Sequence, residues 1–298
     1  GVVPVSSEAA ALFASGGGTI DIYGKAYNHP AGSPGADAFG DSRPFQTEPD
    51  VVRYSGADFF GVASSNDAYL NGPAQNLVAS PSFPSGHTTY GYTESLLLGI
   101  MVPERYTQMI ARGAEYGNSR IVIGAHYAMD VLAGRTLAYY DMAHLLADSP
   151  AFLGQTLARV PVTDYQSALA AATADVAKAL AARCGTAVAV CASGDTGRFS
   201  NAAVDKAFYE STQTYGLPIV YDNTALRVED IAVVAPEAGY LLKAAFPTLT
   251  LAQADQILTD SEGPGGGFLD NGSAFGAYSR LDLFKAGEAA ALATRGGR

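Results

Sequence analysis

Basic residues are scarce in this chain. Its 298 residues include 18 lysines and arginines against 29 aspartates and glutamates, which gives a formal net charge of −11. So acidic a chain repels phosphate backbones and anionic lipid headgroups, which argues against a nucleic-acid partner and against an anionic membrane surface. The few cations that lie beside sequence motifs are therefore informative.

Long apolar runs are lacking as well. The longest one near the motifs described below is Leu-Leu-Leu-Gly-Ile-Met-Val at residues 96–102, well short of the roughly 18 residues that a membrane span needs. We therefore expect no transmembrane segment. With 48% hydrophobic residues, the chain still has enough apolar side chains for a sizeable core and does not have the composition of a disordered protein.

Cysteine is nearly absent. The two cysteines, Cys184 and Cys191, stand close together, with no third cysteine and no metal-ligand spacing. A small disulfide loop is the simplest interpretation and indicates an oxidising compartment, although two reduced, buried cysteines are the alternative. The chain begins at Gly1 without an initiator methionine or signal-peptide pattern. We interpret it as a mature or trimmed product that is secreted or periplasmic.

A possible anion site lies in the stretch Pro-Ser-Phe-Pro-Ser-Gly-His at residues 81–87. Pro84 suits the first position of a helix, because its ring fixes a helical φ angle and its missing N–H is not needed there. The following N–H groups, those of Ser85, Gly86 and His87, would then point outward at a helix N-terminus. Such a turn is a natural seat for phosphate.

A second group of polar residues follows at Ser119-Arg120 and at His126-Tyr-Ala-Met-Asp130. Residues four apart share one face of a helix, so the Asp130 carboxylate can hold one ring nitrogen of His126 while the other nitrogen faces a substrate. This arrangement is typical of a histidine nucleophile. Arg120 adds a permanent positive charge with the fork geometry that oxyanions prefer.

These residues carry a family resemblance. Pro84-Ser85-Gly86-His87 and Ser119-Arg120-x5-His126-x3-Asp130 are similar to two parts of the signature shared by type 2 phosphatidic acid phosphatases, bacterial class A acid phosphatases and vanadium-dependent haloperoxidases. Of these groups, the chain most resembles the soluble bacterial acid phosphatases in the residues around Lys25 and Arg43. The resemblance implies an all-α fold, a helical bundle of the acid phosphatase and vanadium haloperoxidase type.

The remaining part of that signature, Lys-x6-Arg-Pro, is altered here. Arg43-Pro44 matches its end, but Ala36 stands where the family has lysine. We interpret Lys25 as the family lysine, separated from Arg43 by a Gly/Pro-rich insertion, because a loop of that composition closes at a small entropic cost.

The resemblance also implies a set of phosphate ligands. Lys25, Arg43 and Arg120 would bind phosphate oxygens, assisted by Ser85 and by the backbone of Gly86. No metal would be required, because these cations neutralise the charge that a metal would otherwise neutralise.

Three further residues would carry the chemistry. By the same resemblance, His126 attacks phosphorus and forms a phosphohistidine, and Asp130 orients its ring and stabilises the developing charge. His87 protonates the leaving oxygen and then deprotonates the attacking water. His144, near the end of the same predicted helix, is interpreted as structural.

Two enzyme classes fit these residues. The first is a metal-independent phosphoric monoester hydrolase that acts on a small phosphorylated substrate and needs no cofactor. The alternative is a vanadium-dependent haloperoxidase, which holds vanadate in the same pocket. A phosphate-binding module without turnover is disfavoured, because both histidines and Asp130 are present. The sequence does not indicate an oligomeric state.

Periodicity and breaker residues predict mostly helices. We expect a catalytic helical core at 1–150 and a helical part at 151–298 that completes or flanks the bundle, with an irregular connection at 50–79 and a flexible glycine loop at 263–267. The expected helices cover residues 8–13, 87–101, 104–116 (ended by Gly117-Asn118), 120–146, 167–183, 201–214, 228–245, 251–259 and 281–293.

Overall fold

The structure is a computed structural model that describes residues 43–44, 48, 55–57, 63–65, 82–153, 156–157, 160–161 and 164–295. Lys25 and the helix predicted at 8–13 lie outside these residues. The chain divides into two compact units, which are treated separately below. One consists essentially of residues 90–116 and 135 onward, and the other of residues up to 89 together with 117–134.

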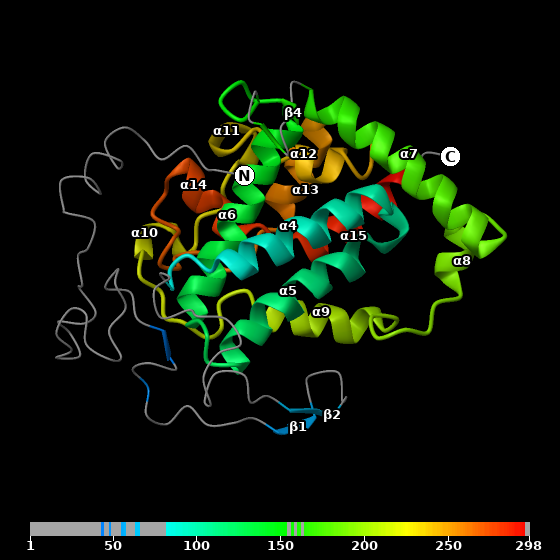
Figure 1. The fold of residues 1–298 in the computed structure, drawn as a ribbon. Coiled ribbons are helices and arrows are strands. Elements are labelled where there is room, and N and C mark those ends of the chain that lie inside the picture. The colour runs from blue at the N-terminus through cyan, green and yellow to red at the C-terminus, as the bar shows by residue number, and fades with distance from the viewer. Residues whose placement is uncertain are drawn as a thin grey trace. The chain divides into compact units, whose positions relative to one another are not determined.

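The described residues are predominantly helical, which confirms the all-α prediction (Figure 1). The division predicted at residue 150 stays a prediction. The α-helices are α4 Gly86–Met101, α5 Tyr106–Val122, α6 Ala128–Leu146, α7 Tyr165–Cys184, α8 Val188–Ser193, α9 Ala202–Ser211, α10 Asp222–Ala225, α11 Ile231–Val234, α12 Tyr240–Lys243, α13 Leu251–Asp260, α14 Ala274–Ala277 and α15 Leu283–Arg295, and the 3-10 helices are η1 Pro103–Arg105 and η2 Tyr278–Arg280.

Short strands form two antiparallel pairs in the described residues. β1 (Ser55–Ala57) pairs with β2 (Ala63–Ser65), and β3 (Thr156–Leu157) pairs with β4 (Val160–Pro161). The first pair lies in the stretch predicted to be irregular, so that prediction is wrong for these two strands.

In the unit that contains residues 90–116, helix α4 buries one face. Tyr92, Leu96 and Ile100 recur every four residues and are at most 2% exposed, as expected for a helix that presents one apolar stripe to a core. Close approach to α5 requires a glycine, because a Cβ at Gly91 would overlap the ring of Tyr116. Packing of α4 therefore depends both on large apolar side chains and on a glycine that leaves room for Tyr116.

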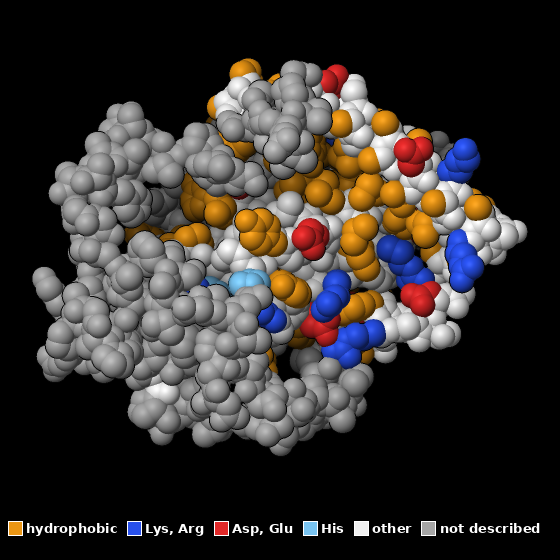
Figure 2. Space-filling model, in the orientation of Figure 1, with side chains coloured by type: hydrophobic (Ala, Val, Ile, Leu, Met, Phe, Trp, Pro, Cys, Tyr) orange, Lys and Arg blue, Asp and Glu red, His pale blue; other side chains and the backbone are white. Residues whose placement is uncertain are grey.

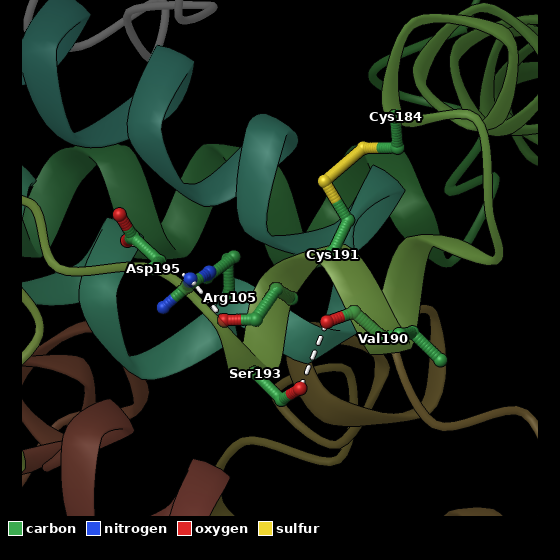
Figure 3. Close-up of a disulfide and its surroundings, with 7 residues drawn as sticks. Arg105, Cys184, Val190, Cys191, Ser193 and Asp195 are labelled. Carbon is green, nitrogen blue, oxygen red and sulfur yellow. Dashed lines mark hydrogen bonds and ion pairs between the residues drawn. A yellow bond between two sulfur atoms is a disulfide. The ribbon is translucent and has the colours of Figure 1, made fainter.

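Cys184 and Cys191 form the predicted disulfide, with an S–S distance of 2.14 Å (Figure 3). It joins the end of α7 to α8 across Gly185, which ends α7 with a left-handed φ of 69°. Arg105 of η1 donates to the Ala192 carbonyl and pairs with Asp195 at 2.9 Å, which fastens α8 to η1.

Ion pairs of this kind are visible on the surface of the same unit. In Figure 2, blue Lys and Arg side chains lie against red Asp and Glu side chains in the region of α5 and α8. One of these pairs joins Arg198 to Glu115 of α5, which also binds Arg112. Exposed pairs of this kind each contribute about 0–1 kcal/mol, so they orient the segment that follows α8 more than they stabilise the fold.

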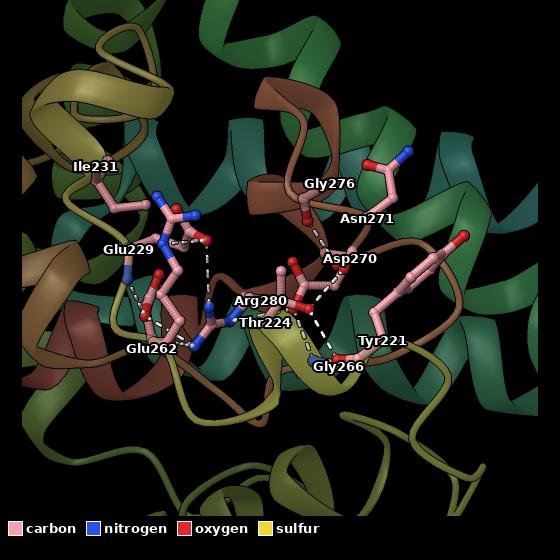
Figure 4. Close-up of polar contacts among 12 residues, drawn as sticks. Tyr221, Thr224, Glu229, Ile231, Glu262, Gly266, Asp270, Asn271, Gly276 and Arg280 are labelled. Atoms are coloured by element: carbon pink, nitrogen blue, oxygen red, sulfur yellow. Dashed lines mark hydrogen bonds and ion pairs between the residues drawn. The ribbon is translucent and has the colours of Figure 1, made fainter.

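The glycine loop predicted to be flexible is fastened by hydrogen bonds (Figure 4). The Gly266 carbonyl accepts the N–H groups of Val220 and Tyr221 at 2.7 and 3.0 Å, and its own N–H donates to Asp270 Oδ2 at 2.7 Å. The prediction is wrong because glycine removes side-chain bulk as well as adding freedom: a Cβ at Gly265 would lie 2.6 Å from the Thr224 carbonyl.

A buried arginine lies beside this loop. Arg280 is 5% exposed and pairs with Glu262 at 3.0 Å, while Glu229 and Asp270 lie 3.8 Å from its other nitrogens (Figure 4). Arg227, which is more exposed, also pairs with Glu229 at 3.4 Å, so three buried carboxylates face one buried and one exposed cation. Burial accordingly raises the pKa of Glu262.

The helices predicted at 87–101, 167–183, 201–214, 251–259 and 281–293 are found with small shifts at their ends, whereas the helix predicted to begin at residue 120 begins at Ala128. Thr250 and Gln253 form a capping box at the start of α13. The stretch at 228–245 contains two short helices, α11 and α12, on either side of Pro236. No helix among the described residues has the length and hydropathy required to cross a lipid bilayer.

Two buried carboxylates make the stability of the protein depend on pH. Asp205 is 1% exposed and has no hydrogen-bond partner among the described residues, and burial raises its pKa to about 6. Burial raises the pKa of Asp255 to about 6 as well. Since both pKa values lie above the ordinary 3.8, the stability that these groups contribute is complete below pH 3.8 and is lost as the pH rises through about 6.

We therefore expect ionisation of these carboxylates to lower the melting temperature of the protein as the pH rises from about 4.5 to about 7. Asp205→Asn should recover roughly 5 °C at the higher pH. Thermal denaturation over a pH series measures both effects. The control is Asp175→Asn, which removes an exposed carboxylate from α7. A pH slope that is unchanged in Asp205→Asn contradicts the prediction.

Candidate active site

The candidate site is built on the turn that precedes α4. The helix begins at Gly86, not at Pro84 as predicted, because Ser85 provides the cap: the Thr88 N–H donates to Ser85 Oγ at 3.2 Å. Pro84 therefore lies outside the helix.

The Ser85 backbone is also engaged. The Ser85 N–H donates to the Asp130 carbonyl at 3.0 Å, so the prediction that this N–H faces an anion is wrong. Within the described residues, the N–H groups of Gly86 and His87 have no acceptor. Of the three amides predicted to face an anion, these two remain able to do so.

Helix α5 ends later than the sequence suggests. The break predicted at Gly117-Asn118 is wrong, since α5 continues to Val122 and ends at Gly124, which has a left-handed φ of 70°. The N–H groups of Ala125 and His126 turn back to the Arg120 carbonyl at 3.0 and 3.1 Å. This turn closes α5 and places His126 in the connection to α6.

The prediction that His126 and Asp130 share one face of a helix is wrong. His126 precedes α6, whereas Asp130 lies in the first turn of α6. They meet by another route. The Tyr127 N–H donates to Asp130 Oδ2 at 2.9 Å, one half of a capping box. The same oxygen lies 3.3 Å from His126 Nδ1. The predicted contact exists, but a helix cap produces it.

The tautomer of His126 follows from its neighbours. Arg43 Nη1 lies 2.9 Å from Nε2 and 3.5 Å from Nδ1, and a guanidinium can only donate, so the nearer nitrogen, Nε2, is the acceptor. The proton of the neutral ring is then on Nδ1, where Asp130 Oδ2 accepts it. Nε2 therefore carries the lone pair that a nucleophile needs.

The two arginines are held by neighbouring oxygens. Arg43 is 2% exposed, and its Nη1 also donates to the Ala125 carbonyl at 3.0 Å. Arg120, in the last turn of α5, donates from Nε and Nη2 to Ser119 Oγ at 3.1 and 3.0 Å. Two fixed positive charges thus belong to the same unit as the histidines.

Electrostatic coupling links His87 to this group. Burial lowers the pKa of His87, and the charges of Arg120, His126 and Arg43 lower it further. Burial also lowers the pKa of His126, although its hydrogen bond to Asp130 acts in the opposite direction. Both imidazoles therefore lose their protons more readily than a histidine in water.

The structure thus brings together five of the residues predicted from sequence around the His126 ring and its cap: Arg43, Ser85, His87, Arg120 and Asp130. Lys25 lies outside the described residues. Sequence reasoning missed Ser82, whose hydroxyl donates to Asp130 Oδ2 at 2.5 Å. The available signal was its place in the same turn, two residues before Pro84. No three His, Cys, Asp or Glu side chains among the described residues are arranged to hold a metal ion.

A family model and several curated proteins match parts of this chain. The family model described as PAP2 superfamily covers residues 34–149. An acid phosphatase of Zymomonas mobilis is 41% identical over 85 residues, which are 28% of this chain and 32% of that protein. A non-specific acid phosphatase of Salmonella typhimurium is 44% identical over 79 residues, or 26% of this chain and 31% of that protein.

A third relative, a non-specific acid phosphatase of Providencia stuartii, is 37% identical over 87 residues, which are 29% of this chain and 34% of that protein. The chain therefore spans about a third of the length of the curated relatives it matches. No solved structure matches the chain.

Packing against α6 holds the Ser85 turn in place, and Gly134 allows the approach. A Cβ at this position would lie 2.6 Å from the Ser85 carbonyl oxygen and 3.0 Å from the Thr88 Cβ. We expect Gly134→Ala to lower the free energy of unfolding by roughly 1–3 kcal/mol, because backbone must move to make room for the methyl group.

Chemical denaturation measures this loss. The control is Gly267→Ala, since a Cβ there meets nothing within 4 Å. Equal stability of the two variants would show that Gly134 does not hold the turn against α6.

Proposed function

We propose that the protein is a phosphoric monoester hydrolase of the acid phosphatase kind, acting through a phosphohistidine. The match of residues 34–149 to the PAP2 superfamily model supports this proposal. The observation that carries the proposal is the His126 ring, whose Nδ1 faces a carboxylate while its Nε2 faces a guanidinium. A histidine so arranged presents a lone pair at a site prepared for an anion.

Phosphate would be bound by cations and by amides. Arg43 and Arg120 supply two permanent positive charges. The N–H groups of Gly86 and His87, at the N-terminus of α4, can donate to the phosphate oxygens. Ser85 keeps its hydroxyl proton for donation, since its oxygen accepts from Thr88. We propose the same role for Lys25, interpreted as the family lysine that an insertion separates from Arg43. This set balances a phosphate dianion without a metal.

The first step transfers the phosphoryl group to His126. The Nε2 lone pair forms a bond to phosphorus as the bond to the leaving oxygen breaks, and His87 donates a proton to that oxygen. Asp130, which accepts from Nδ1, offsets the positive charge that develops on the imidazole ring. The leaving alcohol departs neutral.

The second step releases phosphate. Water attacks phosphorus, His87 takes a proton from the water, and the P–N bond breaks with its electron pair returning to Nε2. Inorganic phosphate and neutral His126 result. Both proton transfers use one imidazole that begins the cycle protonated and ends it protonated.

The acid phosphatase names of the relatives favour this chemistry over the haloperoxidase alternative. They also support a small phosphorylated substrate. The Cys184–Cys191 disulfide favours a secreted or periplasmic location, because such bonds persist where the environment is oxidising.

Substitution of the two histidines separates their roles. We expect His126→Ala to lower kcat with p-nitrophenyl phosphate at least roughly a thousand-fold, because the nucleophile is lost. His87→Ala should still release p-nitrophenolate, which needs no proton, but should then accumulate phosphoenzyme. With an alkyl phosphate it should lose roughly 100- to 10,000-fold at the first step.

Burst kinetics and labelled phosphate in alkali-quenched samples measure both effects, since a P–N bond survives alkali. The matched control is His144→Gln, because His144 stacks on Phe152 at a ring-centroid distance of 4.8 Å and lies in the other compact unit. Full activity of His126→Ala would refute the proposed mechanism.

The pH dependence of kcat/KM tests the division of labour. The free enzyme must hold His126 neutral and His87 protonated, and the pKa of His87 lies below its ordinary 6.5. We therefore expect kcat/KM to decline as the pH rises through the lowered pKa of His87, so that the decline begins below pH 6.5 and activity is greatest under mildly acidic conditions.

Arg120→Gln should move this decline to higher pH, because the charge that lowers the pKa of His87 is removed. The control is Arg112→Gln, an exposed arginine on the same helix that pairs with Glu115. A decline that begins well above neutrality in the wild-type enzyme contradicts the assignment of His87.

A further inference from the structure

Ser82 occupies a position that the proposed mechanism does not yet use. It is completely buried, and its Oγ lies 2.5 Å from Asp130 Oδ2 and 3.4 Å from His126 Nδ1. A buried hydroxyl between a carboxylate and an imidazole is costly to leave unsatisfied and is therefore constrained in where its proton points.

The direction of that proton can be derived. An ionised carboxylate only accepts hydrogen bonds, so the short contact to Asp130 Oδ2 requires Ser82 to donate. The serine then presents a lone pair to His126 Nδ1. Both oxygens beside Nδ1 are acceptors, and the proton of the neutral ring is held there from two sides.

The turn before α4 donates two hydrogen bonds to Asp130. Ser82 donates to its side chain, and the Ser85 N–H donates to its main-chain carbonyl at 3.0 Å. The Tyr127 N–H fixes Oδ2 from within the start of α6 at 2.9 Å. Without Ser82, the carboxylate keeps one fixed donor and can rotate away from the ring.

We propose that Ser82 is a positioning residue for His126: its hydroxyl orients Asp130 and accepts from Nδ1, which keeps the lone pair on Nε2. This inference rests on the proposed function, in which Nε2 is the atom that attacks. Ser82 does not touch the phosphoryl group. It acts before the reaction, by fixing the tautomer, and during it, by holding Asp130 beside the positive ring.

The direct test is the protonation pattern of the His126 ring. Nitrogen-15 NMR distinguishes the Nδ1–H from the Nε2–H tautomer, and His126→Gln assigns the signal among the four histidines of the chain. We expect the Nδ1–H tautomer in the wild-type protein. Ser82→Ala should convert a substantial fraction to Nε2–H, whereas Ser82→Thr, which keeps the hydroxyl, should not.

Activity provides a second readout. With p-nitrophenyl phosphate, Ser82→Ala should lower kcat roughly 10- to 100-fold, the usual effect of removing a group that orients a reactive one, with KM changed by less than about twofold. The control is Ser95→Ala, which removes another buried hydroxyl, 8% exposed and on α4. It should leave both the tautomer and kcat unchanged.

The outcomes are distinct. A wild-type tautomer and kcat in Ser82→Ala overturn the inference, as does a tautomer change of the same size in Ser95→Ala. If Ser82→Ala does not fold, Ser82→Cys fills a similar volume with a weak donor and gives the same comparison. A fully active His126→Ala enzyme overturns the proposed function instead, and the tautomer of Ser82→Ala is read independently of that result.

Discussion

The site depends on one polarised imidazole. His126 lies between Arg43, which can only donate hydrogen bonds, and Asp130, which as a carboxylate can only accept them. This opposition places the single proton of the neutral ring on Nδ1 and leaves the lone pair on Nε2. Burial makes the assignment strict, since the ring is 1% exposed and water does not compete for either nitrogen.

The fold meets this requirement with helix ends. Gly124 ends α5 so that His126 falls in a short connection, and Asp130 lies in the first turn of α6, where its side chain caps the backbone. The turn before α4 then reaches Asp130 through Ser85 and Ser82. Helix interiors supply rigidity, while Asp130, Ser85 and Arg120 contribute from helix ends, where backbone groups are unpaired and side chains can bridge to them.

The motifs predicted which residues belong to one site better than they predicted how these residues meet. His87, Arg120 and Asp130 do interact with His126 or with one another, while their catalytic roles stay a prediction. The helix boundaries were wrong where two signals competed: Gly117 looked like a breaker but is buried inside α5, while Gly124 ends the helix. Ser82 was missed because its role depends on contacts with residues 44 and 48 positions away, which local patterns do not contain.

The contact between Arg43 and Nε2 gives the resting site a property of its own. A lone pair covered by a guanidinium is not open to stray metal ions or to small electrophiles, both of which seek free imidazole nitrogen. An oxyanion competes for a guanidinium. In the proposed mechanism, binding of the substrate would therefore draw Arg43 away from the ring and expose the Nε2 lone pair only when phosphate is present.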